Sequence, residues 1–281
     1  MTANFAGTPS PRLATTFRRV AWPAVAAAVL ALAGCADAPT APNSQAARVL
    51  APSGKLRVGL YPGSPTSIIP ASSPGEARGV GHDVGRDFAR RLGVPFEPVV
   101  FERNAEVLEA GKEGRVDLVL TNATAARAKF LDFSPTVLEI EQGYLVARGS
   151  TIASAADVDR AGVRVGVSQG STSQGVLAKE LRHAVVVPTP NLKAAAEMLS
   201  AGRLDAFATN KAILFEMGDG LPGSRVLDGR WGMERFAFGI PKGRDAALPL
   251  LGELVAGARA EGVVATAVER AGVRGTPAKS H

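Results

Sequence analysis

Cysteine and histidine are scarce in this sequence. Cys35 is the only cysteine among 281 residues, and the three histidines are His82, His183 and His281. A single thiol cannot form an internal disulfide, and no histidine has further metal-ligating residues at ligand spacing. His82 has only Asp83 beside it, which is more typical of a helix-capping pair than of a metal site. We therefore expect no disulfide, no metal site and no cofactor.

Aromatic residues and long runs of one charge are scarce as well. Aromatic residues make up 5% of the chain, and basic residues alternate with acidic ones along it. The formal net charge falls from +6 to +3 once the three arginines that precede residue 35 are removed. A nucleic-acid surface needs basic residues gathered on one face, so we expect no nucleic-acid partner.

The first 35 residues have the pattern of a secretory leader. A basic start without acidic residues precedes an apolar run at 21–33 that is too short to span a bilayer as a helix. The run ends in Leu32-Ala33-Gly34-Cys35, which resembles a bacterial lipobox. This resemblance implies that Cys35 is lipidated and anchors the protein on the periplasmic side of the cell envelope. The alternative is a plain secretory signal followed by an incidental cysteine.

Composition changes again after the leader. Residues 36–53 are rich in Ala, Pro, Asn and Ser and lack periodicity, so we expect a flexible tether. The chain from Gly54 onward is long enough for two lobes with cores of their own. The boundaries that we expect are residues 54–137 with 237–275 for lobe 1, and residues 143–231 for lobe 2.

Strand and helix patterns alternate in the first half of this body. Such a rhythm predicts a mostly parallel sheet with helices on both faces. Ligands of open α/β sheets bind at the carboxyl ends of the strands, and Tyr61 and Asn122 both lie at such ends. The expected strands are 56–61, 96–101 and 116–120, and the expected helices are 79–92 and 106–111.

The second half repeats the pattern. A strand at 163–167 is followed by a Ser- and Thr-rich turn, and a helix then runs through Leu181. Hydroxyl groups and free N–H groups at a helix N-terminus suit an anion, so Ser171 and Thr172 are candidate ligand-binding residues. A later strand at 204–210 ends in Asn210, the third candidate of this half. Helices are expected at 192–199, 248–260 and 263–271.

The segment from Thr121 to Ser134 carries a more specific pattern. Thr124 is a candidate N-cap for a helical turn, and Arg127 can hold a planar carboxylate with two parallel hydrogen bonds. Thr124, Arg127 and the run 132–134 resemble the Thr-x-x-Arg…Asp-Phe-Ser pattern of the family 3 extracellular solute-binding proteins. These are the ligand receptors of polar amino-acid ABC importers. The usual Pro-Glu between Thr and Arg is replaced here by two alanines.

Further phrases resemble the same family in order, so that the resemblance covers residues 55–272. It implies a two-lobed, type II periplasmic-binding-protein fold, in which two hinge crossings near 137–142 and 230–236 join lobes that are each a mostly parallel sheet with flanking helices. It also implies that Arg127 and the turn around Thr124 hold the ligand's carboxylate. The function implied is capture of a small polar solute for an ABC permease by a monomeric protein that closes about a hinge.

Asn210 departs from the family pattern, which commonly has an Asp there for the ligand's ammonium group. A neutral Asn cannot compensate a buried ammonium, and we expect no other acid at that strand end. The ligand expected is therefore an acid without a free amine, or a more extended one, and Asn210→Asp is expected to gain amino-acid binding. The alternative is that an acid from elsewhere, such as Asp83 or a hinge glutamate, supplies the charge.

The sequence does not favour either of two enzymatic interpretations. The run 166–170 fits Gly-x-Ser-x-Gly between a strand and a helix, but no histidine follows at a suitable place for a general base. A cyclohexadienyl-type dehydratase on the same scaffold needs an acid in the cleft. The candidates near the hinge, Glu139 and Glu141, belong to no motif, so we expect a binding protein and not an enzyme.

Overall fold

The computed structural model describes residues 45–71 and 76–277. They belong to one compact unit that runs from Pro39 to the C-terminus. The leader and Cys35 lie outside the described residues. Within the described part of the chain, no helix has both the length and the apolar character needed to cross a bilayer.

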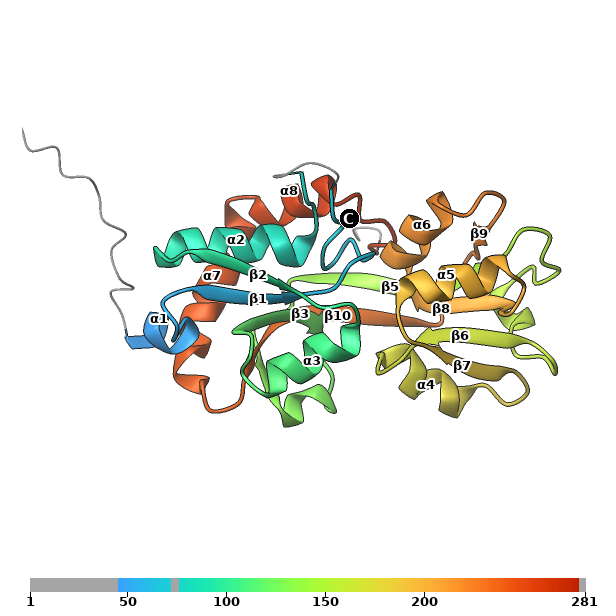
Figure 1. Cartoon of the computed structure of the whole chain (residues 1–281), viewed down its shortest axis with the longest axis horizontal. Helices are drawn as coiled ribbons and strands as arrows, with labels where there is room; N and C mark the ends of the chain where they lie inside the picture. The colour runs from blue at the N-terminus through green and yellow to red at the C-terminus, as the bar shows by residue number, and fades with distance from the viewer. Residues whose placement is uncertain (1–44, 72–75, 278–281) are drawn as a thin grey trace, which may run out of the picture. The chain divides into compact units, whose positions relative to one another are not determined.

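The described strands form one mixed sheet of ten strands (Figure 1). The β1 strand pairs in parallel with β2 and β3, and β6 pairs in parallel with β7 and β8. Two long antiparallel strands, β10 and β5, lie between these parallel groups. The order across the sheet is β2 (Phe96–Val100), β1 (Leu56–Leu60), β3 (Leu118–Asn122), β10 (Gly232–Pro241), β5 (Leu138–Val146), β8 (Ala206–Asn210), β6 (Arg164–Ser168) and β7 (Val185–Thr189), with β4 (Leu131–Phe133) on β10 and β9 (Arg225–Val226) on β5.

The two hinge crossings expected from the sequence are the strands β5 and β10. Gly232 lies opposite Gln142 and Phe236 opposite Leu138, so the two segments pair along the whole predicted crossing. Both strands also pair with the parallel groups on either side, since β10 bonds to β3 and β5 bonds to β8. The crossings are therefore part of the sheet itself.

Eight α-helices are described. Helix α6 is absent from the elements expected above, because the sequence pattern suggested only that the preceding strand ends in polar residues. The helices are α1 (Gln45–Leu50), α2 (Val80–Leu92), α3 (Asn104–Lys112), α4 (Thr172–Glu180), α5 (Leu192–Ser200), α6 (Lys211–Asp219), α7 (Leu248–Ala260) and α8 (Val263–Arg270), and short 3-10 turns occur at Arg127–Lys129, Ala155–Asp157 and Asp245–Ala247.

The expected tether is wrong from Gln45 onward. Helix α1 begins there, and Ala47, Leu50 and Ala51 are buried in the same hydrophobic cluster as β1 and α2. Burial of these apolar side chains stabilises a helix whose composition alone looked like that of a linker.

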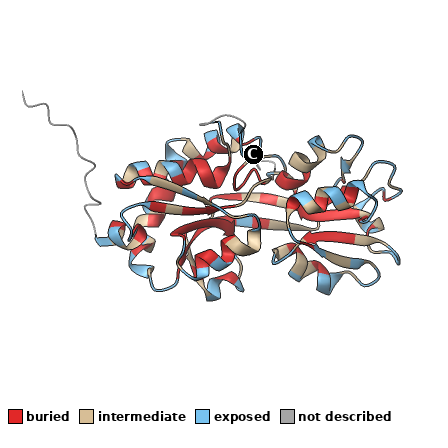
Figure 2. Ribbon diagram, in the orientation of Figure 1, coloured by how far each residue is buried: buried red, intermediate tan, exposed pale blue. Residues whose placement is uncertain are grey.

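Strand alternation divides the core of the first lobe into two layers. Leu118 and Leu120 of β3 are buried in the cluster that contains α2, whereas Val119 between them is buried with Val107 of α3. Successive side chains of a strand point to opposite faces, so α2 and α3 cover opposite faces of the sheet. Figure 2 shows the buried residues concentrated along these strands.

The second lobe is built in the same way. Ala206 and Ala208 of β8 are buried with Leu177 of α4, and Phe207 is buried with Leu199 of α5. The three parallel strands β8, β6 and β7 thus lie between α4 and α5, and Asn210 at the carboxyl end of β8 lies opposite Gln142 of the crossing strand β5. Each lobe therefore brings the ends of its parallel strands to the same region.

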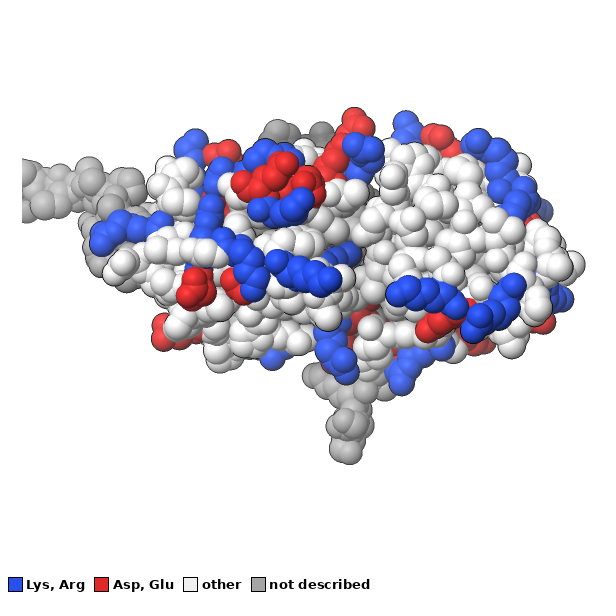
Figure 3. All heavy atoms as spheres, turned by 90° about the horizontal axis from the view of Figure 1, so that it is seen from below, with Lys and Arg blue, Asp and Glu red and all other residues white. Residues whose placement is uncertain are grey.

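Charged side chains of both signs lie next to one another on the face seen in Figure 3.

One ion-pair cluster is buried: the Asp117 carboxylate is fully inaccessible and lies 2.7 Å from a guanidinium nitrogen of Arg57 and 2.7 Å from one of Arg244. Because Arg57 lies in β1, Asp117 precedes β3 and Arg244 follows β10, this cluster joins three segments of the first lobe.

Candidate ligand-binding site

The carboxyl ends of four parallel strands meet around a small cavity. Its volume is about 30 Å³, roughly the space of one water molecule. Five of the seven side chains predicted to bind ligand line this cavity. Glu234 and Phe236 of β10 line it as well. The lining residues are Tyr61, Asn104, Leu120, Thr121, Asn122, Arg127, Ser168, Ser171, Thr209, Asn210, Ile213, Glu234 and Phe236.

Arg127 lies in the wall contributed by the first lobe. The chain leaves β3 in a turn, and the Thr124 hydroxyl accepts a hydrogen bond from the Arg127 backbone N–H at 3.3 Å. The helical turn that the sequence predicted here is a 3-10 helix over Arg127–Lys129. Its geometry directs the guanidinium back over the strand end, where Arg127 is only 8% exposed.

The guanidinium of Arg127 has no carboxylate partner in the part of the chain that the structure describes. Its Nη1 donates to the Thr121 hydroxyl at 2.6 Å and to the Asn122 carbonyl at 3.2 Å. No ion pair of Arg127 and no hydrogen bond from its Nε or Nη2 occurs within residues 45–71 and 76–277. Burial lowers the pKa of Arg127, and the charge of Glu234 acts in the opposite direction. The surface-exposed arginine that composition alone favours is therefore not what the structure shows.

Glu234 is the residue of this cavity that the sequence analysis missed. It lies on the crossing strand β10, is 6% exposed and forms no ion pair within the described residues. One carboxylate oxygen accepts from Asn210 Nδ2 at 3.0 Å and the other accepts from Gln142 Nε2 at 3.3 Å. Burial is the main cause that raises the pKa of Glu234, while Arg127 and the Asn210 hydrogen bond oppose it.

A signal for Glu234 is present in the sequence. Phe236, Phe238 and Ile240 alternate along β10 and are all buried, and Glu234 shares their parity. Because side chains two apart on a strand lie on one face, the alternation predicts that this carboxylate points inward with them. Arg235, of opposite parity, has a 66% exposed side chain.

Asn210 has two roles in the structure. Its side-chain oxygen accepts from the Ile213 backbone N–H at 3.2 Å and so caps helix α6, and its amide nitrogen donates to Glu234. The expectation that no acid lies at this strand end is wrong, because the crossing strand brings Glu234 into contact with Asn210. Glu234 lies within the predicted crossing at 230–236, and the alternative that a hinge glutamate supplies a charge to the ligand stays a prediction.

The wall of the second lobe contacts the first lobe directly. The Ser171 hydroxyl lines the cavity and caps α4 by accepting from the Gln174 N–H at 3.1 Å. Thr172 and Thr124 are not lining residues, although the Thr172 hydroxyl accepts a hydrogen bond from Asn122 Nδ2 at 3.3 Å. That bond joins the two lobes across the cavity.

Tyr61 follows β1 and contributes the remaining predicted side chain. It is half-buried and lines the cavity, and burial raises the pKa of its phenol. A neutral phenol can donate or accept a hydrogen bond, so Tyr61 adds polarity to the site without adding charge.

The chemistry of a serine hydrolase is not assembled here. Ser168 lines the cavity, but neither histidine of the described residues does: His82 lies in α2 and bonds to Asp83 at 2.8 Å, and His183 is exposed. In the described part of the chain, no group of three or more His, Cys, Asp or Glu side chains is arranged to hold a metal ion.

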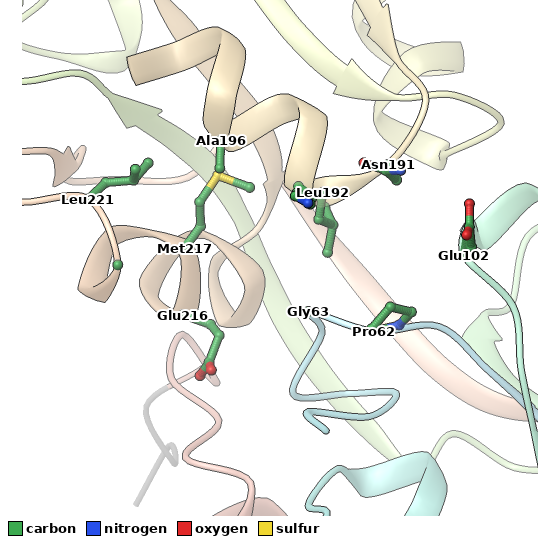
Figure 4. A pocket seen from close by; sticks show the side chains of 11 residues that line it. Pro62, Gly63, Glu102, Asn191, Leu192, Ala196, Glu216, Met217 and Leu221 are labelled. Atoms are coloured by element: carbon green, nitrogen blue, oxygen red, sulfur yellow. The ribbon is translucent and has the colours of Figure 1, made fainter. Parts of the chain in front are cut away.

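A larger cavity, of about 660 Å³, lies between α5, α6 and the loop after β1 (Figure 4). Leu192 and Ala196 of α5 and Met217 of α6 give it an apolar lining. Glu216 also lines it, but this carboxylate already pairs with Arg78 at 2.8 Å. By volume alone, this cavity is the better candidate for a ligand-binding site. Arg127 and Glu234, however, line the smaller cavity, and they are buried charges without ion-pair partners among the described residues. We place the candidate site in the smaller cavity for that reason.

The sequence is similar to those of two glutamine-binding proteins. The chain is 27% identical over 179 residues to a glutamine-binding protein of an ABC transporter from Bacillus subtilis (strain 168), which covers 62% of this chain and 65% of that protein. It is 27% identical over 196 residues to a glutamine-binding protein from Geobacillus stearothermophilus, covering 67% of this chain and 73% of the other. The chain thus spans about two thirds of the length of these curated relatives.

Solved structures share the fold. A structure described as an ancestral arginine-binding protein bound to glutamine has a TM-score of 0.70 and 26% identity, and covers 77% of this chain and 97% of its own. A solute receptor for L-cysteine from Neisseria gonorrhoeae has a TM-score of 0.72 at 22% identity, covering 81% and 93%. The model of the bacterial extracellular solute-binding proteins, family 3, matches residues 56–271, and the chain belongs to that family.

Proposed function

We propose that this chain captures a small, polar, carboxylate-bearing solute between its two lobes and delivers it to the permease of an ABC importer. The observation that carries the proposal is Arg127, a buried guanidinium that lines the cavity and has no carboxylate partner among the described residues. An uncompensated buried charge is costly. A ligand carboxylate in two parallel hydrogen bonds with the guanidinium compensates it.

Binding requires the lobes to separate. The cavity of about 30 Å³ is far smaller than the roughly 300–1,000 Å³ of typical ligand pockets. We assign residues 54–137 with 237–275 to one lobe and residues 143–231 to the other, with β5 and β10 as the hinge. Bending of these two strands opens the cleft, and closure then encloses the solute.

The same proposal places the protein in the cell envelope. Lipidation of Cys35 would hold the monomer at the periplasmic face of a membrane, within reach of a permease, and residues 36–44 would connect the anchor to α1. Multiple acyl chains give stable attachment, which a single chain does not.

The enzymatic alternative loses its support. The family is one of solute-binding proteins, and the relatives compared above are binding proteins. Glu234 is an acid in the cleft, as a dehydratase requires, but its position beside Asn210 and opposite Arg127 equally suits a binding role. The chain is a binding protein and not an enzyme.

A thermal-shift screen of the purified protein tests the proposal. The panel contains the L-amino acids, the matching amine-free acids and, as controls, the matching primary amides that lack a free carboxylate. A solute present at about one hundred times its dissociation constant adds about 2.7 kcal/mol to stability. Shifts produced by carboxylates but not by amides support the proposal, and the absence of a shift with every carboxylate at millimolar concentration contradicts it.

A further inference from the structure

The segment that follows α8 contacts both lobes. It begins at Ala271, which is buried in the hydrophobic cluster of the first lobe, and runs from α8 toward α6 (Figure 1). The Gly275 carbonyl accepts a hydrogen bond from the backbone N–H of Glu141 at 2.8 Å. Pairing of β5 with β8 begins only at Gln142, so this bond uses a part of β5 that β8 leaves unpaired. We call residues 271–277 the C-terminal strap.

The strap also lies directly on the start of α6. A Cβ atom on Gly275 would come within 2.3 Å of the Cβ atom of Lys211, the first residue of that helix. Gly275 moreover has a φ of 83°, which other residues rarely adopt. A glycine at this position therefore permits a contact that any larger residue would prevent.

An ion pair connects the strap to the other end of α6. Arg274 donates two hydrogen bonds to the Asp219 carboxylate, one of them at 3.2 Å. Its guanidinium also lies 4.7 Å from the centre of the Phe215 ring, within the range of a cation–π interaction. Phe215 and Asp219 are four residues apart, so they lie on the same face of the helix.

Arg78 makes a second connection to the same helix. It pairs with Glu216 of α6 at 2.8 Å and donates a hydrogen bond to the Ala271 carbonyl at the start of the strap. In the assignment of lobes given above, both arginines belong to the first lobe and both carboxylates to the second. Within residues 45–71 and 76–277, these two are the ion pairs that join one lobe to the other.

We propose that the C-terminal strap and Arg78 form a latch that favours the closed arrangement of the lobes. This inference rests on the hinge motion of the proposed function but not on the identity of the solute. Helix α6 moves with the second lobe, because Ile213 and Leu214 are buried in that lobe's core. Asp219 ends this nine-residue helix, roughly 12 Å from the hinge end. Bending of β5 and β10 therefore moves the α6 carboxylates away from the two arginines.

The latch affects binding through the population of the closed arrangement. A solute that binds the closed protein has an apparent affinity that falls with the closed fraction. Exposed ion pairs are individually weak, so we expect loss of both to raise the ratio of open to closed protein about three- to tenfold. The side chains of Arg274 and Asp219 are 43% and 65% exposed, and salt screens exposed charges. Added salt should therefore open the wild type and have less effect where the latch is missing.

Pulsed electron double resonance between two spin labels tests the proposal without a solute. The labels are placed at Lys129→Cys, after Arg127, and at Lys179→Cys in α4, both of which are exposed positions on different lobes. The full chain carries Cys35→Ser so that no other thiol reacts. Its distance distribution is recorded at low and high salt, with and without each carboxylate of the thermal-shift screen.

The variants compared are a double substitution, Arg78→Ala with Arg274→Ala, and a matched control, Arg90→Ala. Arg90 is exposed, and its ion pair with Asp87 lies within α2. We expect the double variant to show more of the longer distance, a smaller response to salt and an affinity lower by up to tenfold, and the control to match the unsubstituted labelled chain. A charge exchange, Arg274→Asp with Asp219→Arg, should close the lobes again relative to Arg274→Asp alone.

The outcomes separate the latch from the proposed function. Solute-dependent distances in the labelled chain, together with unchanged distances and unchanged affinity in the double variant, overturn the latch and leave the proposed function standing. A double variant that is more closed or binds more tightly also overturns the latch. Distances that no carboxylate of the screen alters in the labelled chain overturn hinge closure, and both proposals fail with it.

Discussion

Replacing Arg127 with methionine is expected to weaken solute binding without weakening the fold. The substitution removes two hydrogen bonds, to the Thr121 hydroxyl and to the Asn122 carbonyl, each with a net contribution of about 1 kcal/mol. It also removes a buried charge that has no ion-pair partner among the described residues, whose desolvation costs several kcal/mol. The solute-free protein should therefore be as stable as wild type or more so.

Affinity changes in the other direction. Loss of the charged partner of a buried carboxylate costs roughly 2–5 kcal/mol, which corresponds to a factor of about 30 to several thousand in the dissociation constant. Arg127→Lys should also bind poorly, because an ammonium keeps the charge but not the planar fork. The opposite signs of the two effects mark a residue that serves binding at some expense of stability.

The assay combines calorimetric titration of a solute from the screen with chemical denaturation of the solute-free protein. Arg235→Met is the matched control. This arginine follows Glu234 on β10, but its side chain is 66% exposed and pairs with Glu139. The control should retain wild-type affinity. The reasoning is refuted if Arg127→Met binds the solute as wild type does, or if it unfolds several kcal/mol more easily, which would make Arg127 a structural residue.

Three further outcomes are expected. Cys35→Ser should move the protein from the membrane fraction to the soluble one with unchanged solute affinity, and a mutant that stays with the membranes contradicts lipidation. Asp117→Ala should destabilise the fold by about 3–5 kcal/mol in urea, because it leaves Arg57 and Arg244 without their buried partner, whereas Asp219→Ala, whose carboxylate is 65% exposed, should cost less than about 1 kcal/mol. Small-angle scattering should show a radius of gyration that differs between the solute-free and saturated protein if the lobes move, and identical profiles argue against hinge motion.

The sequence predicted the elements that periodicity defines well. Helix α2 begins after Gly79, which has a φ of 153° that a side chain would strain, and it buries Val84, Phe88 and Leu92 as the helical spacing indicated. The end of β8 at Asn210 was also predicted, whereas β3 continues two residues beyond the predicted end at Leu120. Local patterns are sufficient for such features because each element carries its own apolar face.

Other features depend on contacts that no local pattern contains. Helix α1 has a linker-like composition and is recognisable only through the burial of Leu50 against the first-lobe core. Helix α6 begins at Lys211, directly after an asparagine whose residue type fits a strand end and a helix cap equally well. Glu234 was missed because it lies on β10, and only strand pairing brings that part of β10 to the end of β8.

The contact between Asn210 and Glu234 changes what Asn210→Asp is expected to do. Asn210 Nδ2 lies 3.0 Å from a carboxylate oxygen of Glu234, so an aspartate there would place two carboxyl groups in contact. Like charges at that distance cannot both ionise in a buried site, and one group keeps a proton. The single substitution should therefore add no net negative charge and gain no amino-acid affinity, contrary to the expectation from the family pattern alone.

If Glu234 supplies a charge to the solute, the double substitution Asn210→Asp with Glu234→Gln should restore binding that Glu234→Gln loses. It keeps one buried carboxylate beside the same cavity, the glutamine introduced on β10 is then available to donate to it, and an aspartate can still cap α6 toward the Ile213 N–H as asparagine does. Calorimetry of the two single variants and the double variant forms a double-mutant cycle, in which neighbouring residues that share one role show a large coupling energy. Recovery of affinity in the double variant to within about tenfold of wild type supports a single charge shared between two strands. Equal gains from Asn210→Asp with and without Glu234 would show that Glu234 carries no charge that the solute uses.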